Sequence, residues 1–151
     1  MKNNIIFLCI LFGILMMCFL TSCKNANNGN EIEYIDLFVT PDQALLSPSG
    51  NYEAVIEKFD NDGVRSYSLF IIDADNGVDL KYEADLIFRA RDKNFIFWAD
   101  EEDILWAYNS DVGVYFWVND NGIWTKKSYV DNRTEKVPQI LRELRPRVFN
   151  N

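Results

Sequence analysis

The sequence contains few residue types that could perform nucleophilic, general-base or metal chemistry. It has no histidine, and its three cysteines, Cys9, Cys18 and Cys23, all lie near the N-terminus. Histidine is the commonest general base in enzymes and a common zinc ligand, so the sequence argues against the usual triads and zinc sites. Twenty-three acidic residues remain, and their spacing selects neither a catalytic pair nor a calcium loop. We therefore expect no enzymatic activity, no metal and no cofactor.

Cys23 has the most specific surroundings of the three cysteines. It ends the sequence Leu20-Thr21-Ser22-Cys23, which follows Lys2 and an uncharged, mostly apolar run from Ile5 to Leu20. A positive start, an apolar run and small residues at a cleavage point are typical of a signal peptide. The four residues resemble the lipobox of bacterial lipoproteins. This resemblance implies that residues 1–22 are removed and that the Cys23 thiol carries a diacylglycerol.

The lipobox resemblance also implies a location. A residue that carries two or more acyl chains anchors stably in a bilayer, so the membrane is the first expected partner. The protein would be held by its N-terminal lipid on the cell membrane or the outer membrane, with its domain outside the cytoplasm. Lys24 follows the cysteine, in the place where an inner-membrane retention signal has an aspartate.

The rest of the chain divides into a tether and one domain. Residues 24–30, Lys-Asn-Ala-Asn-Asn-Gly-Asn, have no large apolar side chain, so we expect residues 23–30 to be the lipidated cysteine and a flexible tether. Residues 31–151 suffice for a single globular domain with its own core. This domain contains no cysteine, so it forms no disulfide.

Regularly spaced turn residues predict a mainly β domain. From Tyr52 onward apolar and polar residues alternate, and sequences rich in Asp, Asn and Gly interrupt them at residues 60–63, 75–77 and 119–122. We expect an antiparallel meander or sandwich-like sheet of about six to eight strands. A short amphipathic helix over residues 137–145 should dock on it, and Pro146 should end that helix.

Three further local predictions concern the first half of the domain. Residues 34–39 are expected to form the first edge strand. Thr40-Pro41-Asp42-Gln43 is expected to cap a short helix that ends near Leu46. The strand from Ser66 to Asp73 has apolar residues on both faces, which predicts a central strand that is covered on both sides.

Part of this region resembles a known repeat. Residues 47–54, Ser-Pro-Ser-Gly-Asn-Tyr-Glu-Ala, and 69–77, Leu-Phe-Ile-Ile-Asp-Ala-Asp-Asn-Gly, resemble one blade of the WD40-like β-propeller repeats of TolB-type envelope proteins. The resemblance covers residues 47–77, and no second Ser-Pro-x-Gly sequence occurs. It implies the geometry of a local hairpin and no activity. The same opening is similar to small uncharacterised bacterial lipoproteins.

The net charge of −8 limits the range of partners. Nucleic-acid binding needs a basic footprint, so an acidic body of this kind excludes it. Basic residues are concentrated after Lys126, which leaves the preceding part of the domain strongly acidic. Such a surface either stays solvated or steers a basic partner.

Aromatic strands and an acidic turn supply the candidate binding surface. The residues are Trp98, Trp106, Tyr108, Tyr115 and Trp117 on the strands, and Asp100, Glu101, Glu102 and Asp103 in the turn. In one interpretation the rings pack the core and the acids form a solvated turn. In the other they form an exposed patch that contacts a protein or glycan partner.

These observations favour a lipid-anchored extracytoplasmic lipoprotein with a non-catalytic binding domain, whose ligand stays open. Two alternatives remain. One is an immunity or inhibitor-type lipoprotein that protects its cell against a basic secreted toxin. The other is a carbohydrate-binding or glycosidase-like module that places two carboxylates beside tryptophan rings.

Overall fold

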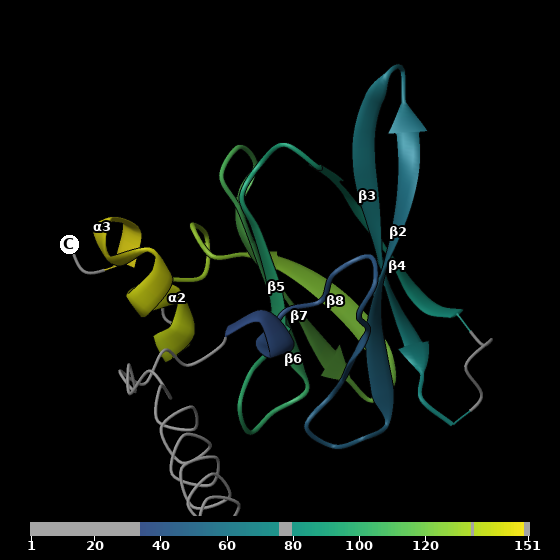
Figure 1. Cartoon of the computed structure of the whole chain (residues 1–151). Coiled ribbons are helices and arrows are strands. Elements are labelled where there is room, and N and C mark those ends of the chain that lie inside the picture. The colour runs from purple at the N-terminus through teal and green to yellow at the C-terminus, as the bar shows by residue number, and fades with distance from the viewer. Residues whose placement is uncertain (1–33, 76–79, 134, 150–151) are drawn as a thin grey trace, which may run out of the picture. The chain divides into compact units, whose positions relative to one another are not determined.

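A computed structural model describes residues 34–75, 80–133 and 135–149 (Figure 1). The expected signal peptide, Cys23 and the expected tether lie outside the described residues. None of the helices in the described ranges has the length and apolar character that crossing a bilayer requires.

In the described residues, eight strands form two antiparallel sheets of four, each in sequence order (Figure 1). The first sheet contains β1 (Leu45–Leu46), β2 (Tyr52–Asn61), β3 (Val64–Asp73) and β4 (Leu80–Arg89). The second contains β5 (Asn94–Trp98), β6 (Ile104–Asn109), β7 (Gly113–Asp120) and β8 (Ile123–Ser128). This arrangement confirms the expected fold class, a mainly β domain with a short C-terminal helix.

The tightest turns are formed by residues that tolerate a left-handed backbone. Between β2 and β3, Asp62 and Gly63 have φ angles of 53° and 82°, and the Asp60 carboxylate accepts the Gly63 N–H at 2.7 Å. Between β7 and β8, Asn121 and Gly122 have φ angles of 52° and 88°. Positive φ at both central residues matches the right-handed twist of a two-residue hairpin, which is why the sequence predicts both turns.

The two sheets share one apolar core. Ala54 of β2, Leu69 and Ile71 of β3, and Leu105 and Trp117 of the second sheet are fully buried in it. On β2 and β4 the core residues follow the period of two that the sequence predicts. Burial of these side chains is the main stabilising term for a domain that has no disulfide.

A second core lies on the other face of the second sheet. There α2 (Gln139–Leu144) buries Leu141 against Trp106 and Phe116, and Val137 precedes the helix in the same cluster. The predicted helix therefore forms and docks. Pro146 ends α2 but begins a further turn, α3 (Pro146–Phe149), because proline is favoured at the first helical position (Figure 1).

Two predictions for the N-terminal part of the domain are wrong. Tyr34–Leu37 form a 3-10 helix, η1, instead of an edge strand. Thr40 and Gln43 exchange two backbone hydrogen bonds of 2.9 and 3.1 Å, which close a tight turn and prevent the expected helix. The chain then pairs as β1 with β2.

The prediction that β3 is covered on both sides is also wrong. It is central in its sheet, and Leu69 and Ile71 on its inner face are fully buried. On its outer face Phe70 and Ile72 stay partly exposed and belong to neither core. The physical reason is that α2 packs on the second sheet, so its apolar face is not available to the first.

A buried asparagine holds the loop between β6 and β7, which gives a stability prediction. Asn109 is 1% exposed; its side-chain oxygen accepts the N–H groups of Asp111 at 2.7 Å and Val112 at 2.8 Å. Asn109→Ala should lower the free energy of unfolding by about 1–2 kcal/mol, because these donors lose their acceptor. Chemical denaturation measures the loss. The control Asn51→Ala, at an exposed side chain, should change it by less than about 0.5 kcal/mol; equal losses would contradict the prediction.

An ion pair between edge strands gives a pH prediction. Lys126 of β8 bonds Asp85 of β4 at 2.5 Å, and this hydrogen bond lowers the pKa of Asp85. A carboxyl group whose pKa is lower in the folded state stabilises the fold above its unfolded pKa of about 3.9. This contribution is lost as pH falls through the folded pKa. Asp85→Asn should therefore flatten the acid limb of a plot of Tm against pH.

The Asp85 effect should be small, because 67% of the side chain is exposed and solvent screens the pair. Glu83→Gln on the same strand is the matched control, since it removes the same charge from an exposed carboxylate that forms no ion pair within the described residues. If both variants flatten the acid limb equally, the ion pair is not the cause.

Candidate functional site

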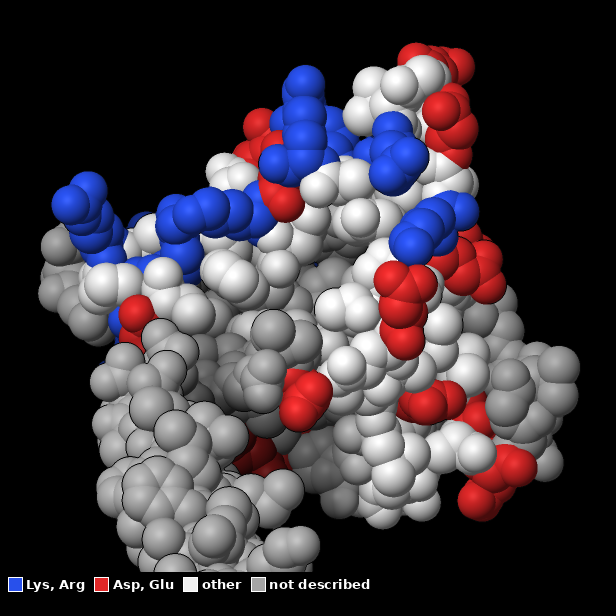
Figure 2. Space-filling model, in the orientation of Figure 1, with Lys and Arg blue, Asp and Glu red and all other residues white. Residues whose placement is uncertain are grey.

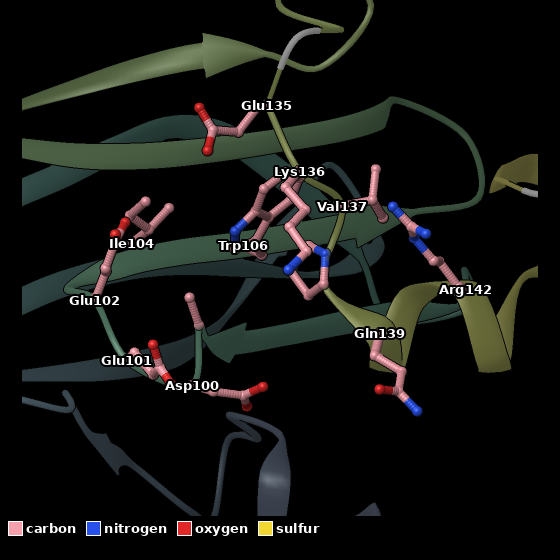
Figure 3. Close-up of a pocket in the computed structure, with 12 residues that line it drawn as sticks. Asp100, Glu101, Glu102, Ile104, Trp106, Glu135, Lys136, Val137, Gln139 and Arg142 are labelled. Atoms are coloured by element: carbon pink, nitrogen blue, oxygen red, sulfur yellow. The ribbon is translucent and has the colours of Figure 1, made fainter.

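The acidic turn between β5 and β6 borders a hollow of about 530 Å³ (Figure 3). Asp100, Glu101 and Glu102 lie along one wall, and Ile104 and Trp106 of β6 line its inner side. The opposite wall is the segment 135–139 with Arg142 of α2. The hollow therefore brings together the turn between β5 and β6 and the segment that leads into α2.

Local backbone hydrogen bonds position the acidic wall. The β5–β6 pairing ends at Trp98 and Leu105, and Ala99 donates its N–H to the Ile104 carbonyl at 2.9 Å. The Ile104 N–H in turn bonds the Glu102 carbonyl at 2.7 Å. These bonds hold Asp100, Glu101 and Glu102 in an exposed loop at the end of the hairpin.

The opposite wall is anchored by burial. Val137 and Leu141 are inserted into the core beneath α2, and this fixes the residues beside them. Gln139 and Arg142 come from the helix, across the hollow from the acidic turn (Figure 3). Glu135 and Lys136 lie in the segment that leads into the helix, so this wall carries charges of both signs.

Asp103 has a different role from its three acidic neighbours. Its carboxylate accepts the Ser49 N–H at 3.0 Å and the Ser49 hydroxyl at 2.6 Å. These bonds connect the acidic turn to the turn at residues 47–50 of the first sheet. Asp103 lines a second hollow, and Glu102 and Ile104 line both.

The structure places most of the predicted aromatic surface inside the domain. Trp98 and Trp117 are 8% and 0% exposed in the core between the sheets, and Trp106 and Tyr108 are 1% and 4% exposed beneath α2. Tyr115 is half-buried. Of the five rings, only that of Trp106 lines the hollow. They pack the cores, as the first interpretation of the sequence expects, because the second sheet is covered on both faces.

Sequence reasoning missed the C-terminal wall. Glu135, Lys136 and Arg142 lie far along the chain from the acidic turn, and no local pattern connects them with it. The predicted docking of the helix was the only signal that could have indicated this wall.

The acidic side of the hollow suits a cationic group with an apolar stem, opposite the cations Lys136 and Arg142 of the other wall. Its carboxylate wall attracts positive charge, and its inner side offers apolar surface along which the carbon chain of a lysine or arginine can lie. Within the described ranges, no three His, Cys, Asp or Glu residues are grouped so that they could hold a metal ion.

No protein-family model matches this chain, and neither a curated protein sequence nor a solved structure matches it. Its function is therefore inferred from its own residues and their geometry.

The hydrogen bonds of Asp103 give a prediction about how the acidic turn is held. Asp103→Ala removes the acceptor for both Ser49 donors, so it should reduce the free energy of unfolding by about 1 kcal/mol. It should also speed hydrogen exchange at the Ser49 amide. Glu101→Ala, at an exposed residue of the same turn, is the control and should change neither quantity. An unchanged Ser49 exchange rate in Asp103→Ala would rule out this connection.

Proposed function

We propose that this protein is a bacterial lipoprotein, held by Cys23 on the outer side of a membrane, whose domain acts by binding and not by catalysis. This proposal rests on the sequence Leu20-Thr21-Ser22-Cys23, which lies at the end of an apolar run. Cleavage before Cys23 would leave every strand of the described domain in place.

The residues of the domain support binding as its mode of action. Residues 24–151 contain neither histidine nor cysteine. Asp100, Glu101 and Glu102 lie on an exposed turn, where water reaches them, whereas catalytic carboxylates usually lie in enclosed sites. An open acidic wall instead suits a partner that brings positive charge.

A second candidate is an immunity or inhibitor-type lipoprotein that binds a basic secreted toxin. The specific observation in its favour is the acidic wall of the hollow, which suits a lysine or arginine of a toxin. A toxin gene adjacent to the gene for this protein would support this candidate, and its absence would weaken it.

The carbohydrate alternative loses its main support. All four tryptophans are buried, and none exposes more than 8% of its surface. Sugar-binding sites stack their ligands on exposed aromatic faces, and the indole rings of this domain offer none.

The lipid anchor gives a direct prediction. In a bacterial host, the wild-type protein should partition into detergent, and mass spectrometry should find a chain that begins at an acylated Cys23. Cys23→Ser should leave the chain uncleaved and without lipid, because serine has no thiol to modify. Cys18→Ser, in the apolar run that precedes Cys23, is the matched control and should behave as wild type.

Recovery of wild-type protein with its initiator methionine and a free Cys23 thiol would overturn the proposed anchor. Acylation that persists in Cys23→Ser and disappears in Cys18→Ser would show that the modified cysteine was misassigned.

A further inference from the structure

The outer face of the first sheet carries an apolar column that neither core uses. It is formed by Val55 of β2, Phe70 and Ile72 of β3, and Ile87 of β4. None of the four packs into the core between the sheets or the core beneath α2. Ile87 is 48% exposed, and the other three are partly exposed.

Strand register makes these residues neighbours. Val55 lies directly opposite Phe70, and Ser68 lies opposite Ile87. Ile72 follows Phe70 on the same face of β3. Side chains that are opposite or diagonal across an antiparallel pair are within reach of one another, so the column is a continuous strip across β2, β3 and β4.

The same register places three carboxylates beside the column. Arg89, also on this face, pairs with Asp92 and Asp111. Glu53 lies opposite Ile72, Glu57 opposite Ser68, and Glu83 opposite Phe70. Within the residues that the structure describes, none of these three forms an ion pair; Asp85, also on this face, pairs with Lys126. We call Glu53, Glu57 and Glu83 the acidic rim.

Charges are distributed unevenly over the domain. In the view of Figure 2, lysines and arginines gather along the upper edge and over the C-terminal helices, while acidic side chains predominate on the lower part of the first sheet. Burial of the apolar column alone would leave the rim carboxylates desolvated without partners, which is costly. A partner that covers the column must therefore bring positive charge to the rim.

We propose that the outer face of the first sheet docks a basic protein whose contact surface places lysines or arginines around an apolar centre. A second copy of this chain is a poor occupant, because a symmetric contact through this face would set carboxylates against carboxylates. An anionic lipid surface is disfavoured for the same reason. This inference goes beyond the proposed function, since it requires neither the hollow nor the lipid anchor.

The test uses the full chain in neutral detergent and a fluorescent peptide of about ten residues, the length of a long strand, that alternates lysine with valine or phenylalanine. Fluorescence polarisation measures binding, and the signal of protein-free micelles is subtracted. Binding should saturate and should weaken as salt is raised. A peptide that alternates lysine with serine should bind far more weakly, because it lacks the apolar centre.

Two variants with the same change in net charge locate the contact. Reversal of the acidic rim with Glu53→Lys, Glu57→Lys and Glu83→Lys should weaken binding about tenfold or more. The matched control, Asp36→Lys, Asp120→Lys and Asp131→Lys, changes three exposed acids outside the first sheet. It should alter binding by less than about twofold.

A third variant tests the apolar column. Ile87→Ser should weaken binding several-fold while circular dichroism stays that of wild type, because Ile87 belongs to neither core. The proposal is overturned if the wild-type chain does not bind the peptide or if both triple variants weaken binding equally. It is also overturned if the peptide that alternates lysine with serine binds as tightly as the peptide with the apolar residues. It is also overturned if sedimentation shows a dimer that Ile87→Ser dissociates, since a second copy then covers the face. Whether the Cys23→Ser variant is released from the membrane does not affect these outcomes, so the docking proposal and the lipid-anchor proposal are tested separately.

Discussion

The second sheet carries large apolar side chains on both of its faces, and both faces must be covered. The first sheet covers one face through the core that contains Leu105 and Trp117, and α2 covers the other through Leu141. A helix of this length is marginal in isolation, so its position depends on the apolar surface that it buries. This double coverage fixes the C-terminal segment against β6 and so creates the wall opposite the acidic turn.

The same requirement leaves the first sheet with only one covered face. Its inner face is packed, while the outer face retains Phe70 and Ile87 at the surface among carboxylates. The short C-terminal helices cover only one further sheet face, and in this domain they cover the aromatic side chains of β6 and β7. The apolar column on the first sheet therefore stays exposed because α2 packs on the second sheet.

Local signals predicted most of the strands and the C-terminal helix, whereas contacts between distant parts of the chain determine where the hollow forms. The turn at Asp62-Gly63 and the alternation in β4 could be recognised because backbone sterics and burial act on neighbouring residues. At Thr40 the capping signal failed because reciprocal hydrogen bonds to Gln43 closed a turn that the sequence also permits. The hollow could not be predicted, since Glu102 and Arg142 line the same hollow only because α2 docks on the second sheet.

Acidic residues in this domain divide into those that bond to another part of the fold and those that form no such contact within the described residues. Asp103 connects the acidic turn to the turn at residues 47–50 through its hydrogen bonds with Ser49. Asp85 of β4 forms an ion pair with Lys126 of β8. Both are satisfied within the molecule, so they contribute little attraction for a partner. The excess negative potential comes from the carboxylates that the fold does not use, at the hollow and on the outer face of the first sheet. Because a potential of this kind acts over about a Debye length, it raises the encounter rate of a basic partner before either surface is touched.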